Sequence, residues 1–277
     1  MRTQAEKAAA FRALHERPGA FIIPNPWDAG TARLLASLGF EALATTSLGF
    51  ANTLGRPDGA NAVSRREVVE HCRTIAGATE LPVNADLENC YAHEPRAAAE
   101  MIRLAAEAGV VGGSIEDASG DRSNPIYDFQ LAVERVHAAV ETARSLPVPF
   151  MLTARAENLL HDRLDLDDTI RRLQAFEKAG ADVLYAPGLR DLATIRTVVA
   201  SVGRPVNVVT HFDPAITLEQ LAEAGAKRIS VGGALSRLAL AAFLKGAREM
   251  RERGGFTWTR DIVPSNELRA VFGESQK

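Results

Sequence analysis

The sequence predicts a single (β/α)8 barrel, a prediction that depends on two patterns. Along its 277 residues, eight short β-rich runs alternate with longer segments that have the periodicity of helices. Most of the short runs are apolar almost throughout, as parallel strands must be when helices cover both faces of their sheet. Right-handed crossovers are the strong default for such units, and eight of them in series close into a barrel.

Each of the eight predicted strands is followed by a segment that can form a helix. The strands cover residues 21–24, 42–46, 82–87, 112–117, 150–156, 182–186, 205–210 and 228–231. Residues 166–178 illustrate the helical segments, because Ile170, Leu173 and Phe176 share one stripe and charged residues occupy the opposite face. Glycines able to end a helix in the left-handed conformation precede four strands, at positions 39, 109, 180 and 225.

An open, doubly wound sheet is the main alternative architecture. Its dinucleotide-binding form carries a G-x-G-x-x-G turn directly after the first strand. Here the first strand is followed by residues 25–30 (NPWDAG), which lack that pattern. The barrel is therefore the favoured fold.

Residues 255–277 form a tail beyond the eighth helical segment of what we expect to be one domain, residues 1–277. The tail is rich in apolar side chains, among them Phe256, Trp258 and Phe272. So much apolar surface outside a barrel predicts that the tail packs either on another subunit or on the outside of its own barrel.

The composition excludes several classes of partner. Lys+Arg 32 against Asp+Glu 35 gives a formal net charge of −3, without the basic excess that binds nucleic acid or an anionic membrane surface. No apolar run approaches the roughly 20 residues needed to cross a bilayer. The two cysteines, Cys72 and Cys90, are too few for a disulfide framework, so we expect a reduced, cytoplasmic setting.

Acidic residues stand where a barrel enzyme places its active site, at the carboxyl ends of the strands. Asp86 and Glu116 end two neighbouring predicted strands, and Asp58 lies on a nearby loop. Three carboxylates without histidine or cysteine favour a hard cation, most economically Mg²⁺, with Mn²⁺ as an alternative ion. The competing interpretation is that these carboxylates cap helices or pair with lysines.

Two other strand ends carry side chains suited to an anion. Arg155 ends the fifth predicted strand, where its guanidinium either clamps a substrate carboxylate or phosphoryl group or pairs with Glu157. Asn207, in the seventh strand, either holds a second carboxylate or caps a loop. His211 follows that strand and is a candidate general acid or base. Cys90 lacks a nearby base in the sequence that would make it a nucleophile.

Six motifs in the same order resemble the isocitrate lyase / phosphoenolpyruvate mutase superfamily across residues 19–239. They are residues 24–30 (PNPWDAG), 54–58 (LGRPD), 84–88 (NADLE), 114–117 (SIED), 153–155 (TAR) and 180–182 (GAD). The resemblance implies a modified (β/α)8 barrel whose terminal helix is commonly exchanged between subunits, and therefore a homodimer or homotetramer. An exchanged helix would explain the apolar tail.

The resemblance also implies roles for individual residues. The acidic set that holds Mg²⁺, directly or through water, matches Asp58, Asp86 and Glu116. The segment whose hydroxyl and backbone N–H groups bind the substrate carboxylate matches Thr46, Ser47 and Leu48, with a one-place ambiguity between Thr46 and Ser47. The arginine that holds the other anionic end matches Arg155, and a strand-seven asparagine that binds carboxylate matches Asn207. The predicted catalytic residues are Arg155, Asp58 and Ser47.

Two departures from the family pattern bear on these roles. Asn84 stands where the family often has aspartate, so metal affinity should fall or direct ligation should shift to Asp86. The loop after Glu116 has no cysteine, whereas the isocitrate and methylisocitrate lyases carry a catalytic cysteine there. We expect this loop, residues 119–127, to gate the site, and its Asn124 is loosely similar to a substrate-binding asparagine of the mutase branch.

These inferences predict a Mg²⁺-dependent lyase or decarboxylase that cleaves a carbon–carbon bond of a small 2-oxo or 2-hydroxy dicarboxylate through an enolate. The metal would act as a Lewis acid, backbone N–H groups near Ser47 would share the enolate charge, and Arg155 would orient the far anionic group. Carbon–phosphorus chemistry on phosphonopyruvate is the alternative activity. A non-catalytic barrel that binds a 2-oxo acid is the alternative outside enzymes.

Overall fold

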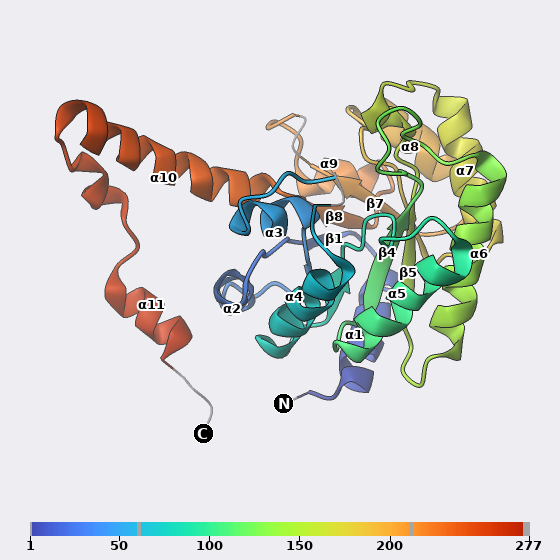
Figure 1. The fold of residues 1–277 in the computed structure, drawn as a ribbon, viewed down its shortest axis with the longest axis horizontal. Coiled ribbons are helices and arrows are strands. Elements are labelled where there is room, and N and C mark those ends of the chain that lie inside the picture. The colour runs from blue at the N-terminus through green and yellow to red at the C-terminus, as the bar shows by residue number, and fades with distance from the viewer. Residues whose placement is uncertain (1, 60–61, 211–212, 274–277) are drawn as a thin grey trace.

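Eight parallel strands surround one axis in the computed structural model, which describes residues 2–59, 62–210 and 213–273 (Figure 1). Every strand falls inside its predicted run. The strands are β1 (Phe21–Ile23), β2 (Leu43–Ala44), β3 (Val83–Ala85), β4 (Gly112–Glu116), β5 (Met151–Arg155), β6 (Val183–Tyr185), β7 (Val206–Val209) and β8 (Arg228–Ser230).

The sheet closes almost completely into a barrel. Its hydrogen-bonded order runs β1-β8-β7-β6-β5-β4-β3-β2, so the first strand pairs with the last, as an open doubly wound sheet does not allow. The remaining gap is bridged by the Ala44 N–H, which donates to the Pro24 carbonyl at 3.0 Å. Asn25 reinforces the seam, because its Nδ2 donates to the Thr45 carbonyl and its Oδ1 accepts from Gly232 N–H.

Helices cover the outside of this barrel, as buried parallel strands require. They are α2 (Ala29–Ser37), α3 (Ser47–Thr53), α4 (Arg65–Gly77), α5 (Pro95–Glu107), α6 (Phe129–Ser145), α7 (Leu166–Lys178), α8 (Leu192–Ala200) and α9 (Leu218–Glu223), with a 3-10 turn η1 (Asn158–His161) after β5. Helix α10 (Ala234–Arg253), which follows β8, leaves the barrel. The four junction glycines have φ of 84°, 99°, 104° and 89°, which confirms the predicted left-handed helix ends.

The amino-terminal helix α1 (Gln4–Glu16) closes the barrel at the amino ends of the strands. One side of this helix is exposed, but Phe11 is completely buried against the barrel interior. An apolar layer lies between this helix and the barrel centre, formed by Phe21, Ile23, Ala42, Ala44, Met151 and Val183. The barrel is therefore plugged at this end.

His15 makes the plugged end sensitive to acid. Its ring is buried against Phe11 and Phe21, and its Nδ1 lies 2.8 Å from the Phe11 carbonyl oxygen. Burial, followed by the charge of Arg228, lowers the pKa of His15 to about 3. The unfolded chain binds this proton below about pH 6.5 and the folded chain does not, so the free energy of unfolding should fall as the pH falls through that interval.

Replacing His15 with phenylalanine should therefore flatten the pH dependence of stability. In the native protein the one proton taken up by unfolded His15 lowers the free energy of unfolding by up to about 1.4 kcal/mol for each pH unit below pH 6.5. The variant lacks this proton and should not show that decrease. Urea unfolding across this pH range measures it, and the same substitution at the exposed His137 is the control. A slope in His15→Phe equal to that of the native protein would contradict the assignment.

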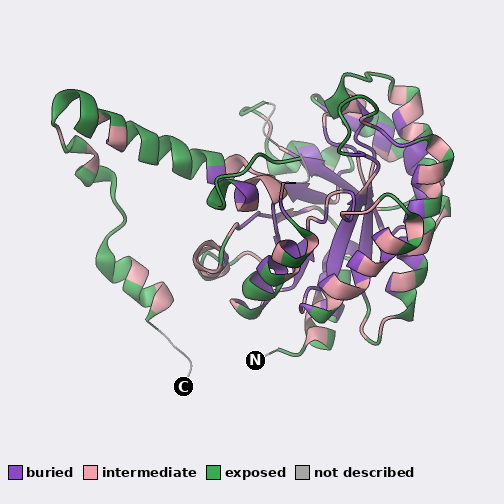
Figure 2. Ribbon diagram, viewed as in Figure 1, coloured by how far each residue is buried: buried purple, intermediate pink, exposed green. Residues whose placement is uncertain are grey.

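The carboxyl-terminal arm, residues 234–273, projects from the barrel (Figure 1). Helix α10 is exposed along most of its length, including Leu238 and Phe243, which are 66% and 69% exposed (Figure 2). It is followed by η2 (Thr257–Asp261) and α11 (Ser265–Phe272), and α11 returns to α2 through a hydrogen bond of 2.7 Å from Arg33 to the Val271 carbonyl. No helix in the described part of the chain is both long and apolar enough to span a membrane.

Candidate active site

A cavity of about 260 Å³ reaches from the carboxyl ends of the strands into the barrel. Most of the site residues predicted from the sequence line it, although they come from distant parts of the chain. They are Thr46, Ser47, Leu48, Asp58, Asn84, Asp86, Arg155 and Asn207. The structure therefore brings the predicted carboxylate-binding segment, acidic residues and arginine to one place.

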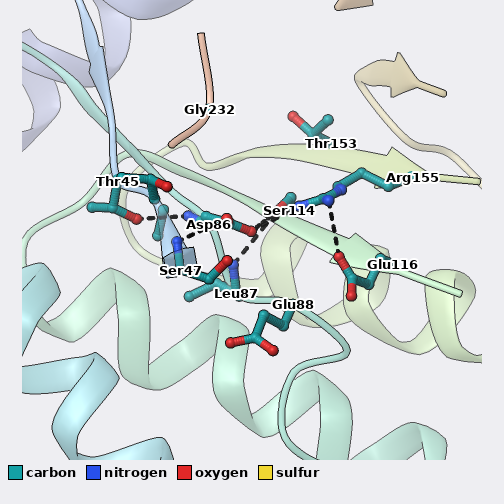
Figure 3. A network of polar contacts seen from close by, with 12 residues as sticks. Thr45, Ser47, Asp86, Leu87, Glu88, Ser114, Glu116, Thr153, Arg155 and Gly232 are labelled. Carbon is teal, nitrogen blue, oxygen red and sulfur yellow. Dashed lines mark hydrogen bonds and ion pairs between the residues drawn. The ribbon is translucent and has the colours of Figure 1, made fainter. Parts of the chain in front are cut away.

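Asp86, one residue beyond the end of β3, is held in a fixed orientation (Figure 3). Its backbone N–H donates to Thr45 Oγ1 at 2.8 Å, and its Oδ2 accepts from the Ser47 N–H at 3.1 Å. Its Oδ1 accepts from Arg155 Nη1 at 2.8 Å and, at 3.5 Å, from Ser114 Oγ. Both carboxylate oxygens therefore face donors at the cavity wall.

Arg155 ends β5 and is the centre of the charged cluster. Its Nη1 lies 2.8 Å from Asp86, its Nη2 lies 3.1 Å from Glu116, and its Nε lies 2.8 Å from Glu157. The Tyr185 ring lies 5.0 Å from the guanidinium carbon. Burial alone would lower the pKa of Arg155, but the surrounding carboxylates raise it well above its usual value. The predicted pairing with Glu157 is present, and three carboxylates already bind Arg155.

Glu116 ends β4 beside Arg155, although its side chain is not part of the cavity lining. Burial raises the pKa of Glu116 well above its usual value, and the charges of Glu157 and Asp86 add to the increase against the opposing Arg155. A further positive charge near Glu116 would therefore strongly stabilise its ionised form.

Glu88 is a site neighbour that sequence reasoning assigned no role. Its side chain points away from Asp86 in Figure 3 and accepts a hydrogen bond of 2.6 Å from Tyr91 Oη. Burial, followed by the charges of Asp86 and Asp58, raises the pKa of Glu88 to about 7. Its φ of 47°, unusual for a residue other than glycine, is the structural sign that this loop is held in a constrained shape.

Asp58 reaches the mouth of the cavity from an exposed loop after α3. Partial burial of its carboxyl and the charge of Asp86 raise the pKa of Asp58, against a hydrogen bond with Ser47 that lowers it. Thr46 caps α3, with its Oγ1 accepting from the Gly49 N–H. The first turn of this helix thus places the predicted carboxylate-binding segment next to the acidic residues.

The donor set fits a hard, hydrated cation. Burial raises the pKa of each of Asp58, Glu88 and Glu116, and the charge of Asp86 adds to each increase, so a cation beside them would favour their charged forms. The Oδ1 atom of Asn84 is buried without a hydrogen-bond partner and remains available as an oxygen ligand. Within the described residues no three His, Cys, Asp or Glu side chains converge into a complete ligand set. A cation here would therefore retain several waters, as Mg²⁺ does.

The amide of Asn207 is largely engaged by its neighbours. Its Oδ1 accepts from Arg228 Nε at 2.8 Å, and its Nδ2 donates to Ser230 Oγ at 3.1 Å. Only one N–H of this side chain is left for a substrate carboxylate. The predicted alternative of loop capping does not describe it, because Asn207 lies in the middle of the sheet.

Besides Glu116, the predicted residue Asn124 is absent from the cavity lining. It lies on the exposed tip of the loop after β4. The base of that loop is anchored, since Ser119 N–H donates to the Pro125 carbonyl and Tyr127 N–H to the Asp117 carbonyl, both at 2.8 Å. His211 lies outside the described residues. Cys90 is fully buried, and burial raises the pKa of its thiol to about 12, which makes it unsuited to nucleophilic attack.

Sequence reasoning missed the polar residues that point into the barrel from below the mouth. Thr153, Arg228, Ser230 and Tyr185 all line the cavity. A sequence signal existed for Arg228 and Ser230, because polar residues at alternate positions of a buried strand share its inner face.

Similar proteins identify the family of this chain. Residues 11–251 match the family model of phosphoenolpyruvate phosphomutase. An oxaloacetate decarboxylase from Ectopseudomonas mendocina is 30% identical over 89% of this chain and 85% of its own. A crystal structure from Burkholderia cenocepacia J2315, provisionally named a lyase/mutase, is 57% identical with a TM-score of 0.95, covering 98% of this chain and 97% of that one.

A further solved structure has the same fold at lower identity. Oxaloacetate acetylhydrolase in complex with the product oxalate has a TM-score of 0.88 at 26% identity, covering 99% of this chain and 96% of that one. The matching barrel and the matching family model agree with the six sequence motifs. The chain therefore belongs to the phosphoenolpyruvate phosphomutase family and is an enzyme of the isocitrate lyase / phosphoenolpyruvate mutase superfamily.

Proposed function

We propose that this enzyme is a Mg²⁺-dependent lyase or decarboxylase that cleaves a carbon–carbon bond of a small 2-oxo or 2-hydroxy dicarboxylate through an enolate. The observation that carries the proposal is the pairing of Asp86 with both Arg155 and the Ser47 N–H at the cavity wall. Relatives that act on oxaloacetate, as their names state, support this substrate class.

The first turn of α3 binds the reacting end of the substrate. Thr46, Ser47 and Leu48 line the cavity there, and backbone N–H groups at a helix start carry partial positive charge. That charge binds the substrate carboxylate and offsets negative charge as it develops on the enolate. Holding these atoms in place also removes the entropy cost of orienting them during the reaction.

Asp86, Asp58, Glu116 and Asn84 are the residues that hold Mg²⁺, directly or through water. The bound ion supplies Lewis acidity beside the 2-oxo group. Asp86 would then be shared between the cation and Arg155. An Arg155 N–H freed from Asp86 would bind an anionic group of the substrate and orient the bond that breaks.

Turnover tests the proposal. Purified protein is incubated with oxaloacetate, isocitrate, methylisocitrate or phosphonopyruvate, each with Mg²⁺ or with EDTA, while pyruvate or glyoxylate is followed. We expect metal-dependent cleavage of at least one of the first three compounds. Turnover of phosphonopyruvate alone would reassign the enzyme to carbon–phosphorus chemistry, and binding without turnover would make the protein a 2-oxo acid sensor.

We also propose that α10 and the arm that follows it pack on a second copy of the chain, giving a homodimer or a larger homo-oligomer. Leu238, Phe243, Phe256 and Ile262 are each more than half exposed on this arm, which is a large apolar surface for a free monomer. Burying it against an equivalent arm removes that surface from water.

The double variant Leu238→Glu/Phe243→Glu is therefore expected to be a monomer. Buried glutamates would need desolvation without partners, so the interface would not form. Light scattering after size-exclusion chromatography measures the mass, and Leu164→Glu, at a 76% exposed leucine outside the arm, is the control. A native protein that is already monomeric at assay concentration would contradict the proposal.

A further inference from the structure

A second buried arginine lies deeper in the same cavity as Asp86 and Arg155. Arg228 is the first residue of β8, is 3% exposed and lines the cavity. Its Nε donates to Asn207 Oδ1 at 2.8 Å and its Nη2 donates to Thr153 Oγ1 at 2.9 Å. Both partners are neutral, so these bonds fix the guanidinium plane without compensating its charge.

The third nitrogen of Arg228, Nη1, is buried without a hydrogen-bond partner. Among the residues that the structure describes, no carboxylate pairs with this arginine, and burial lowers the pKa of Arg228 to about 10. Two other buried arginines have acidic partners: Arg155 pairs with three carboxylates, and Arg172 pairs with Asp117 and Asp168. Arg135 is buried as well, but it donates to the backbone carbonyls of Asn89, Ala92 and His93 and does not line the cavity. Arg228 lines the cavity with a guanidinium nitrogen that has no partner, and a buried guanidinium without an anion costs several kcal/mol.

The position of Arg228 suits one end of a short dianion. It binds Thr153, which lies two residues before Arg155 on the same inner face of β5, a separation of about 7 Å along a strand. The carboxyl groups of a four- or five-carbon dicarboxylate can span such a separation. Arg155 is already surrounded by acids, whereas Arg228 has none, so an anion entering the barrel meets its stronger attraction at Arg228.

We propose that Arg228, oriented by Asn207 and Thr153, binds the second carboxylate of the substrate inside the barrel and so selects dicarboxylates over monocarboxylates. The inference rests on the proposed function for the position of the reacting end, which lies near Asp86 and Arg155, and it transfers the far carboxylate from Arg155 to Arg228. It assigns Asn207 a positioning role, since its oxygen holds Arg228. The competing explanation is an internal water that joins Arg228 Nη1 to the buried Asn84 Oδ1, which would give no selectivity.

Binding of malate and lactate tests the proposal, because the two acids share a 2-hydroxy carboxylate and differ by one carboxyl group. Isothermal titration with Mg²⁺ present is performed on the native protein and on Arg228→Met, which preserves much of the side-chain length. We expect Arg228→Met to weaken malate binding at least about tenfold and to leave lactate binding within about twofold. Equal weakening of both ligands, or of neither, would overturn the proposal.

A second variant keeps the test informative if Arg228→Met does not fold. Asn207→Asp places a carboxylate of the same size against Arg228 Nε, so we expect a higher unfolding midpoint together with weaker malate binding. Unchanged malate binding in this variant would also overturn the proposal. Arg190→Met, at an exposed arginine on the cavity lining, is the matched control. If Arg190→Met loses the preference for malate and Arg228→Met keeps it, the second carboxylate binds at Arg190 and the proposal is overturned.

These measurements separate the inference from the proposed activity. Selectivity for malate that disappears in Arg228→Met supports the anchor even when no carbon–carbon bond is cleaved. Turnover of oxaloacetate with unchanged selectivity in Arg228→Met would contradict the anchor and leave the lyase proposal intact.

Discussion

Arg155→Ala is expected to lower kcat/KM by about 10²–10³-fold on every substrate that the enzyme turns over. The guanidinium binds Asp86, Glu116 and Glu157, so its removal disturbs the acidic cluster and eliminates the group that orients the substrate anion. The loss should appear mainly in kcat if Arg155 acts on the transition state. Steady-state kinetics at saturating Mg²⁺ measure it.

The same variant should also lose stability, because three carboxylates lose their counter-charge. Removing one partner of a buried ion pair costs about 3–5 kcal/mol. Mg²⁺ should restore part of the unfolding midpoint, since it supplies positive charge to the same acids. Arg172→Ala is the matched control: Arg172 is also buried and bound to two aspartates, but outside the cavity, so it should lower stability and leave kcat nearly unchanged. Near-native rates in Arg155→Ala would remove this residue from the site.

Asp86→Asn is expected to abolish the stabilisation by Mg²⁺ and to lower kcat/KM at least about 100-fold. Asparagine preserves the size of the side chain, but its single oxygen can replace only one of the two acceptors that face Arg155 and Ser47, and it removes a negative charge that a cation needs. Without metal the variant should lose less stability than Arg155→Ala, because it breaks one of the three ion pairs of Arg155 and removes a charge that opposes the ionisation of Glu88 and Glu116.

Thermal unfolding with Mg²⁺ and with EDTA, followed by kinetics, measures both effects of Asp86→Asn. Asp182→Asn is the control, because the Asp182 and Asp86 side chains are both 19% exposed and both pair with an arginine, whereas Asp182 lies outside the cavity. A native protein whose unfolding midpoint and activity do not respond to EDTA would contradict the metal site itself.

The positions of the strands could be predicted because they depend on local pattern. A strand covered on both faces needs a continuous apolar run, and each run appears in the sequence. The predicted ends were less accurate where the chain turns early. The second strand ends at Ala44 and not at Thr46, because Thr46 leaves the sheet to cap α3.

The candidate site could be predicted only in part. Topology alone places Asp86, Glu116 and Arg155 at one end of the barrel, since the carboxyl ends of parallel strands meet there. Asn124 was expected from a loose resemblance of its loop, and loop conformation depends on contacts that no short motif specifies. Glu88 and Arg228 were passed over because their importance comes from burial and from the charges around them.

The sequence by itself determined the barrel, the order of its strands and the end at which acidic residues gather, because periodicity and connection handedness act over short stretches of chain. Only the tertiary structure decided which charges are paired. That Arg155 binds three carboxylates while Arg228 binds none depends on the stagger of neighbouring strands and on the rotamers of side chains that face each other across the barrel. These contacts join residues far apart in sequence, and electrostatic energies change steeply with their separation and burial.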